Sequence, residues 1–139
     1  MVHALKEIHR TLAPNGLMVD LRPMGDSWPV EIVSDGEIHP CGRLTDLPAG
    51  ISDDESANHA IRESARRGWF LREEEKFFPL FDYFDDPNEF ENHLKEKWGD
   101  FIQAKESVIH TIRQEWEKTR TGKKLRVRMK MLLGLWRKR

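Results

Sequence analysis

The sequence has little of several features that define common protein classes. Cys41 is its single cysteine, so an intramolecular disulfide is excluded, and a reducing, cytoplasmic setting is the natural interpretation. No apolar run approaches the roughly 18 residues of a membrane-spanning helix, and the N-terminal residues do not resemble a secretion signal. We therefore expect a cytoplasmic protein with no membrane partner.

A dominant charge is also missing. The chain has 23 Lys and Arg against 24 Asp and Glu, and the resulting net charge of −1 gives no bulk attraction to nucleic acid or to a membrane. The distribution is uneven, because every charged residue in 122–139 is basic whereas 52–100 is mainly acidic. Five Trp, seven Phe and five Met supply apolar area for a core, so we expect one folded domain spanning 1–139.

The order of helical and strand patterns predicts an α/β protein. Apolar spacing predicts helices at 2–12 and 53–67, strands at 17–22, 69–76 and 125–133, a small hairpin at 29–41 and helices within 87–121. The domain then has four consecutive parts: a helix–strand unit at 1–23, a hairpin and loop at 24–51, a helix–strand unit at 52–84, and helices with a final strand at 85–139. We expect a small mixed sheet with helices 2–12 and 53–67 on one face and 87–121 helping to cover the other.

Short motifs mark where these elements begin and turn. Asp-Gly at 35–36, between two apolar runs, predicts the turn of the hairpin. Ser52 predicts the first residue of the second helix because Glu55 follows three residues later, as in a capping box. The preceding residues 43–51 are then interpreted as a loop. Asp86 predicts a further helix start.

Two strands are predicted to have different surroundings. The nearly continuous apolar run Leu17–Leu21 suits a strand that is covered on both faces of its sheet. In 125–133, by contrast, apolar and basic residues alternate, so that one face is apolar and the other carries Arg126, Arg128 and Lys130. The aromatic segment 77–84 is interpreted as part of the core, joining two elements.

Residues 4–20 resemble a segment of class I S-adenosylmethionine-dependent methyltransferases. In that family a helix ending in R-x-L-x-P-G-G leads into the fifth strand, and here the string from Arg10 to Gly16 is R-T-L-A-P-N-G, with Asn15 in place of the first glycine. Asparagine also tolerates the left-handed backbone conformation, so the replacement is mild.

The later elements follow the same order. Helix 53–67, which leads through Gly68 into a strand, looks like that family's approach to its sixth strand. Residues 127–133 lie where the seventh strand would be, and in that family the seventh strand runs antiparallel between the fifth and sixth. The resemblance therefore implies a partial Rossmann-like methyltransferase sheet of fifth, sixth and seventh strands, with covering helices and a small extra β-hairpin.

The same resemblance implies that the cofactor-binding half is absent. Family members bind S-adenosylmethionine through a glycine-rich turn after the first strand, where the backbone approaches the ligand closely, and an acidic residue that ends the second strand and accepts hydrogen bonds from the ribose hydroxyls. The nine glycines here never occur as G-x-G, and the first four strands have no counterpart in this chain. We expect no cofactor to bind these residues alone. A methyltransferase activity is then expected only when a cofactor-binding half is joined to them, and no catalytic residue can be assigned.

A partner is expected at the strand Leu17–Leu21. Without a fourth strand beside it, this strand would expose unpaired backbone groups next to apolar side chains, and such edges tend to pair with another chain. We predict a homodimer, or association with a cofactor-binding half, through this strand. Asp20, Arg22 and Asp26 follow the fifth strand, where related enzymes have residues near the substrate, and they are the substrate-side candidates.

Other polar groups are weaker candidates. His39 and Cys41 offer two metal ligands at strand spacing, but a metal site needs three or four, so no metal is expected. As a nucleophile Cys41 would need a base and an electropositive setting, and neither is readable here, so it is interpreted as a small, half-buried residue. The acidic run 73–75 is interpreted as a solvated strand edge. The basic residues of 126–130 and the tail 137–139 are expected to pair with the acidic middle of the chain.

Three functions remain open at this point. The favoured one is a truncated methyltransferase-like protein, inactive alone, that acts as a substrate-side or dimerisation domain. The first alternative is a free-standing protein-binding module that kept the fold and lost the chemistry. The second is a nucleic-acid-binding protein that uses the basic C-terminal strand.

Overall fold

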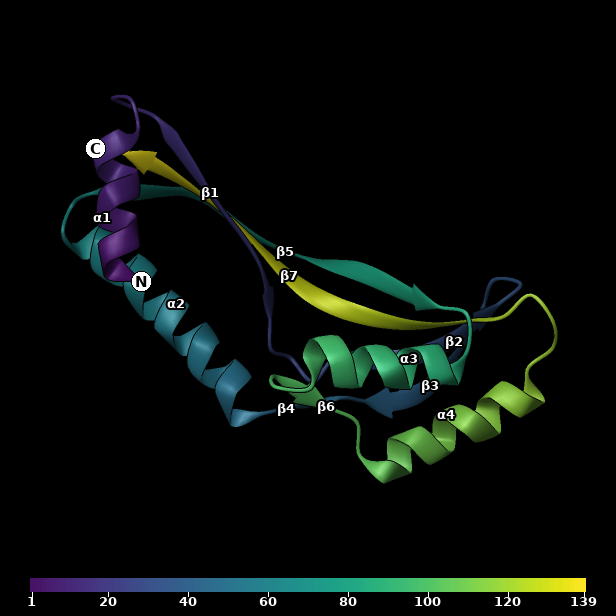
Figure 1. The fold of residues 1–139 in the computed structure, drawn as a ribbon. Coiled ribbons are helices and arrows are strands. Elements are labelled where there is room, and N and C mark those ends of the chain that lie inside the picture. The colour runs from purple at the N-terminus through teal and green to yellow at the C-terminus, as the bar shows by residue number, and fades with distance from the viewer. The chain divides into compact units, whose positions relative to one another are not determined.

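The structure is a computed structural model that describes residues 1–139 (Figure 1). Its helices are α1 (Val2–Thr11), α2 (Pro48–Arg66), α3 (Pro87–His93), the π-helical turn η1 (Leu94–Trp98) and α4 (Glu106–Lys118). Its strands are β1 (Leu17–Met24), β2 (Pro29–Ser34), β3 (Glu37–Arg43), β4 (Thr45–Asp46), β5 (Phe70–Phe84), β6 (Ile102–Gln103) and β7 (Lys124–Lys138). The protein is thus α/β, as the sequence predicted.

The strands form an open antiparallel sheet and a small second sheet. The larger sheet has five strands in the order β1-β7-β2-β3, with β5 also paired to β7, and the smaller one pairs β4 with β6. We expected a mixed sheet. In the structure every paired neighbour is antiparallel: β7 lies between β1 and β5 and runs against both, as the arrows in Figure 1 show, so β1 and β5 do not pair with each other.

The chain divides into two compact units. The first comprises Met1–Met24, Ser52–Phe78 and Met131–Arg139, and the second comprises Gly25–Ile51 and Pro79–Lys130. The long strands β5 and β7 contribute residues to both units. We predicted one domain of four consecutive parts; the structure groups the chain into two units, each built from segments that lie far apart in the sequence.

In the first unit, both helices cover the same face of the sheet. Its core is one cluster drawn from α1, α2 and all three strands: Leu5, Met18, Ala60, Phe70 and Trp136. The C-terminal end of β7 lies beside the first residues of β1 and β5, because the Lys138 N–H donates to the Gly16 carbonyl at 2.8 Å and the Arg139 N–H donates to the Trp69 carbonyl at 3.0 Å. The prediction that helices 2–12 and 53–67 pack on one face is confirmed.

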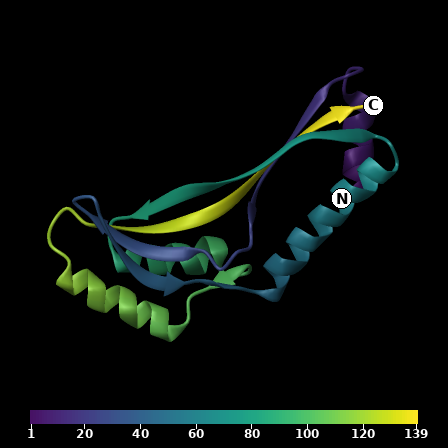
Figure 2. The same cartoon turned by 180° about the vertical axis from the view of Figure 1, so that it is seen from behind.

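In the second unit, the predicted hairpin is confirmed, but it is not a separate addition to the sheet. Its strands pair through Val33 with Ile38, and its turn has positive φ angles at Asp35 (49°) and Gly36 (80°). The same strand β2 also pairs with β7, with Val30 opposite Val127, so the hairpin extends the sheet (Figure 2). The core beneath it gathers residues of β2, β3, β5, β7 and the helices α3 and α4, including Val30, Ile32, Leu125, Val127, Phe90 and Ile112.

Several predicted boundaries are wrong. Helix α2 begins at Pro48 rather than Ser52, so 43–51 is not a loop but contains β4 and a first helical turn. Proline suits this position because the first N–H groups of a helix have no partner in any case. Within the region 87–121, where only helices were predicted, Ile102 and Gln103 form β6, and α4 begins at Glu106. The helix start at Asp86 is confirmed, since its side chain accepts a hydrogen bond from the Glu89 N–H.

The predicted burial of β1 on both faces is also wrong. Met18 is 9% exposed, but its neighbours Leu17, Val19 and Leu21 are 41%, 55% and 57% exposed. Side chains alternate along a strand, and α1 and α2 cover one face only. The continuous apolar run therefore belongs to a strand with one buried and one exposed face, and not to a strand that is covered on both faces.

The aromatic segment 77–84 is a strand with a largely exposed surface and not a plug of the core. It forms the second half of β5, in which Phe77, Phe81 and Tyr83 are 53%, 37% and 51% exposed. Among the aromatic residues in 81–84, only Phe84 is buried. It packs on Phe90, with the two ring centroids 5.4 Å apart. Aromatic residues favour strands for their shape as well as their burial, which explains the difference.

None of the helices combines the length and the apolar character needed to cross a membrane.

Candidate functional site

Asp20 and Arg22, two of the three predicted substrate-side residues, lie together on β1. They are two residues apart and follow Met18, so their side chains share the strand face that α1 and α2 cover. The Arg22 Nε–H is 3.1 Å from Oδ1 and 3.2 Å from Oδ2 of Asp20, and the two side chains are 17% and 16% exposed. Arg22 also donates from Nη2 to Oδ1 of Asn58 on α2, at 2.6 Å. These contacts tie the strand to the helix above it.

Trp136 lies on the same side of the neighbouring strand β7. Its indole packs directly on Gly134, where a Cβ atom would be only 2.7 Å from Nε1 of the tryptophan and 3.5 Å from Cβ of Asp20. Any other residue at 134 would collide with the ring. Glycine therefore allows the indole to lie against the strand, beside Asp20, where Trp136 is 5% exposed.

We call Asp20, Arg22, Asn58, Gly134 and Trp136 the β1 cluster. Two of its buried donors, Nη1 of Arg22 and Nε1 of Trp136, have no acceptor in the protein. Leaving a buried donor unpaired costs about 1–3 kcal/mol, so each of these N–H groups favours an oxygen atom of a water molecule or a small ligand. The Asp20 carboxylate is already engaged by Arg22. The Arg22 and Trp136 groups can therefore each donate a hydrogen bond to an oxygen atom.

Asp26, the third predicted residue, belongs to the second unit. Its carboxylate Oδ2 is 3.6 Å from Nζ of Lys130, and its backbone carbonyl accepts a hydrogen bond from Nη2 of Arg43 at 3.0 Å. Figure 1 shows that the chain leaves β1 before it enters the hairpin. The structure therefore brings Asp20 and Arg22 together, whereas Asp26 helps to hold the segment before β2.

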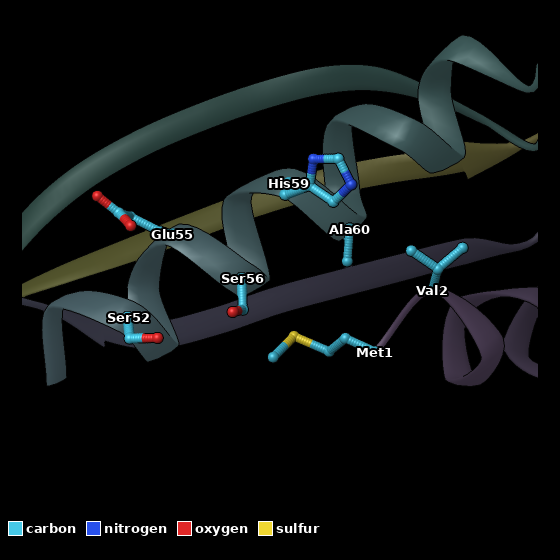
Figure 3. A pocket seen from close by; sticks show the side chains of 7 residues that line it. All are labelled: Met1, Val2, Ser52, Glu55, Ser56, His59 and Ala60. Carbon is cyan, nitrogen blue, oxygen red and sulfur yellow. The ribbon is translucent and has the colours of Figure 1, made fainter. Parts of the chain in front are cut away.

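A groove of about 420 Å³ lies between the start of α1 and residues 52–60 of α2. Figure 3 labels the residues that line it: Met1, Val2, Ser52, Glu55, Ser56, His59 and Ala60. Ser56 and Ala60 project toward Met1 and Val2 in this view. S-adenosylmethionine needs a backbone that approaches it closely, usually through glycines at the carboxyl ends of strands. This groove contains no glycine and runs along a helix, so its residues do not fit that cofactor.

The Cys41 thiol is buried rather than activated. It is 3% exposed, and burial raises its pKa to about 11, with the negative charge of Glu115 adding to the effect. A cysteine nucleophile needs a lowered pKa, so this thiol is not activated, and the residue is buried, whereas we expected it to be half-buried. His39 lies 3.6 Å from a carboxylate oxygen of Glu37. Among the 139 residues, no three His, Cys, Asp or Glu side chains gather closely enough to hold a metal ion.

The cations in the first half of β7 converge on one buried carboxylate. Arg126 donates from Nε to Oε2 of Glu31 at 2.7 Å, and Arg128 donates from Nη2 to Oε1 at 2.9 Å. Glu31 is 4% exposed. We expected these arginines to pair with the acidic middle of the chain, 52–100. The hydrogen bonds are made instead to β2, because β2 is the neighbouring strand and places residue 31 opposite residue 126.

Other cations of β7 do pair with the acidic middle. Arg137 is held by the Glu73 carboxylate, with Nη2 2.8 Å from Oε2, and Lys124 pairs with Asp85. The pKa of Glu73 is lowered, mainly by the hydrogen bond from Arg137. One residue of the acidic run 73–75 therefore pairs across strands and is more than a solvated edge.

The sequence did not reveal the residues that complete the β1 cluster or the carboxylate that binds Arg126 and Arg128. Asn58 and Trp136 are ordinary residues of a helix and a strand until the fold brings them beside Asp20. One signal was present, because an isolated glycine inside an alternating strand, here Gly134, indicates that another group approaches the backbone closely. Nothing in the sequence indicated the role of Glu31, because that role depends on which strand pairs with β2.

Comparisons with protein-family models, curated proteins and solved structures gave no match to this chain.

Proposed function

We propose that this chain is the C-terminal half of a class I methyltransferase-like protein and acts as a substrate-side or dimerisation domain. The observation that supports the proposal is the order of three strands in the first unit. Strand β7 lies between β1 and β5 and runs antiparallel to both, and α1 and α2 lead into the two outer strands from the same face. The resemblance seen in the sequence implies this order for the fifth, seventh and sixth strands.

The connections into the outer strands also support the proposal. The turn after α1 has Asn15 in the left-handed conformation, with φ of 61°, and the Gly16 N–H donates to the Ala13 carbonyl at 2.8 Å. The turn after α2 has Gly68 with φ of 73°. In both connections a left-handed residue stands just before the strand and turns the chain into it, which suits the helix–turn–strand order that the resemblance implies.

The proposed role follows from what these residues offer. S-adenosylmethionine supplies the methyl group in the resembled family, but the 139 residues contain no glycine-rich turn, and the groove beside α2 does not fit the cofactor. We therefore propose that the cofactor-binding half comes from outside these residues. The Arg22 and Trp136 N–H groups of the β1 cluster would then each donate a hydrogen bond to an oxygen atom of the substrate.

The proposed contact surface is β1. This strand is at one end of the strand order, and Leu17, Val19 and Leu21 expose an apolar row along it. An exposed apolar edge strand pairs readily with another chain. In the absence of a cofactor-binding half, the purified chain is expected to form a homodimer through this strand.

Analytical ultracentrifugation tests this surface. Val19→Lys places a charge on the β1 row, and the dimer is expected to dissociate, with an affinity at least about tenfold lower. Ile38→Lys is the matched control, because Ile38 on the outer strand β3 is 54% exposed against 55% for Val19. A wild-type chain that stays monomeric at high micromolar concentration would contradict the dimer, as would equal effects of the two substitutions.

Calorimetry with S-adenosylmethionine tests whether the cofactor binds outside these residues, as proposed. The chain alone is expected to bind none, because its sequence contains no glycine-rich turn of the kind that approaches the cofactor in the resembled family. Micromolar binding by the chain alone would show that the cofactor site lies within these residues and would overturn the proposed half-protein.

A further inference from the structure

The second unit has a sheet face that its helices leave open. Val30 and Val127 are completely buried on the side that faces α3 and α4. Residues next to them along the strands point the opposite way, because side chains alternate. On that face β7 presents Arg126 and Arg128, and the neighbouring strand β5 presents Phe81 and Tyr83, as the contacts below show.

Aromatic rings and cations are interleaved on this face. The guanidinium carbon of Arg126 is 4.5 Å from the centroid of the Phe81 ring, and the ring centroids of Phe81 and Tyr83 are 6.5 Å apart. Tyr83 is 51% exposed and Phe81 37% exposed, so both rings are open to solvent. The two rings belong to the short part of β5 that lies in the second unit.

The face carries a net positive charge. Arg126 and Arg128 share the single carboxylate of Glu31, which leaves one positive charge in excess. The Arg128 side chain remains 47% exposed, whereas that of Arg126 is 15% exposed. Glu31 thus fixes the two guanidinium groups in place without neutralising them. Lys130 continues the row and lies 3.6 Å from Asp26.

We infer that this open face of the second unit binds single-stranded nucleic acid. Exposed aromatic rings on a sheet stack with unpaired bases, and adjacent cations contact the phosphates. Tyr83 and Phe81 supply the stacking surfaces, and Arg128 and Lys130 supply the phosphate contacts. A duplex hides its bases and offers nothing for the rings to stack on. This inference goes beyond the proposed methyltransferase-like role and does not depend on it.

Fluorescence anisotropy with labelled oligonucleotides tests the inference. Oligo(U) and oligo(dT) of about 12 nucleotides are compared with a duplex of the same length, since single-strand sites span about 4–16 nucleotides. The wild-type chain is expected to bind the single strands with micromolar affinity and the duplex at least about tenfold more weakly. Affinity is expected to fall roughly tenfold between about 50 mM and about 200 mM salt, the slope of two to three phosphate contacts.

Two substitutions separate stacking from charge. Tyr83→Ala is expected to weaken binding about tenfold while the salt dependence is retained, because a base loses its stacking partner. Arg128→Glu is expected to weaken binding about tenfold at low salt and to reduce the salt dependence, because a phosphate contact is lost. Both residues are about half exposed, and circular dichroism checks that the variants fold.

Matched controls are available elsewhere in the chain. Phe101→Ala removes a ring that is 46% exposed, and Arg10→Glu reverses a charge on α1 whose side chain is 69% exposed. Neither is expected to change binding more than about twofold. The inference is overturned if the wild type binds no oligonucleotide at low salt, if the duplex binds as well as the single strands, or if the controls weaken binding as much as the two test variants. Binding to anionic lipid vesicles without binding to oligonucleotides would likewise overturn it.

Discussion

The two units are built in the same way but differ in the sheet face that their helices leave open. In the first unit that face is apolar on β1, where Val19 and Leu21 are 55% and 57% exposed. In the second unit it carries the guanidinium of Arg128 and the ring of Tyr83. An open apolar face is costly in water and favours a protein partner, whereas a charged and aromatic face is stable in water and suits a polar ligand. Because the helices cover only one face of the sheet, every second residue of each strand points to the open face and determines its chemistry.

Strand β7 supplies residues to both units and shows how this difference arises. In its first half the buried residues are the odd-numbered ones, such as Leu125 and Val127, and the even-numbered ones are basic. From Leu132 onward the buried residues are even-numbered, and they include Gly134 and Trp136. The change of phase falls where Met131 and Leu132 are both buried. A single strand can thus present different chemistry to solvent in its two halves.

The largest effect is expected when a core side chain is removed from each unit in turn. Phe70→Ala in the first unit and Phe90→Ala in the second each remove a ring that is 2% or less exposed. Each is expected to lower the free energy of unfolding by about 3–5 kcal/mol. Because β5 and β7 run through both units, urea unfolding followed by circular dichroism is expected to remain a single transition. Two separate transitions in either variant would show that the units unfold independently.

A second test compares the carboxylates that hold the cations of β7. Glu31→Gln removes the charge that faces Arg126 and Arg128, and Glu31 is 4% exposed. Stability to urea is expected to fall by about 2 kcal/mol, because glutamine keeps one acceptor oxygen but loses the charge and the hydrogen bond made by the other oxygen. Glu73→Gln is the counterpart in the first unit, where the Glu73 side chain is 35% exposed, and only a small change is expected. Equal effects would contradict the assignment of Glu31 as the anchor of the basic face.

The sequence predicted local structure well and surroundings poorly. Turns such as Asp35-Gly36 and the helix start at Asp86 were found because their geometry depends on neighbouring residues alone. The exposed aromatic segment and the open face of β1 were missed, because burial depends on which strands and helices pack together. A run such as Leu17–Leu21 has the same composition whether one face or both faces are covered.

The candidate site shows the same division. Asp20 and Arg22 were singled out because they follow a predicted strand, and their proximity follows from their spacing of two residues. Asn58 and Trp136 reach them only through the packing of α2 and the pairing of β7, which no local pattern encodes. Sequence reasoning therefore located the strand that carries the cluster but not the residues that complete it.

A smaller effect is expected at the β1 cluster itself. Asn58→Ala removes the acceptor for Nη2 of Arg22, whose Nη1 already lacks one, and is expected to lower the free energy of unfolding by about 1–2 kcal/mol. Asn88 accepts a hydrogen bond from Arg113 in the second unit, at 3.2 Å and exposed to solvent, so Asn88→Ala is the matched control, with an effect of less than about 0.5 kcal/mol. Chemical denaturation of both variants measures the difference. If Asn58→Ala proved as mild as Asn88→Ala, the contact with Arg22 would not stabilise the packing of α2 on β1.

The smallest expected effect is a pH dependence that belongs to the first unit alone. Hydrogen bonds from Arg66 and Arg67 lower the pKa of Glu63 from 4.5 to about 2. A carboxylate with a lowered pKa in the folded state stabilises the fold above its unfolded pKa, and the contribution is lost as pH falls from about 4.5 toward 2. Glu63→Gln is therefore expected to be slightly less stable than the wild type near neutral pH and equally stable near the lower limit of that window. Because these side chains lie at the surface, high salt should shrink the difference at neutral pH. Urea unfolding midpoints of both proteins, measured across this pH range at low and high salt, test the prediction. If the difference in stability between the two proteins does not change with pH, Glu63 stabilises α2 by packing rather than by charge.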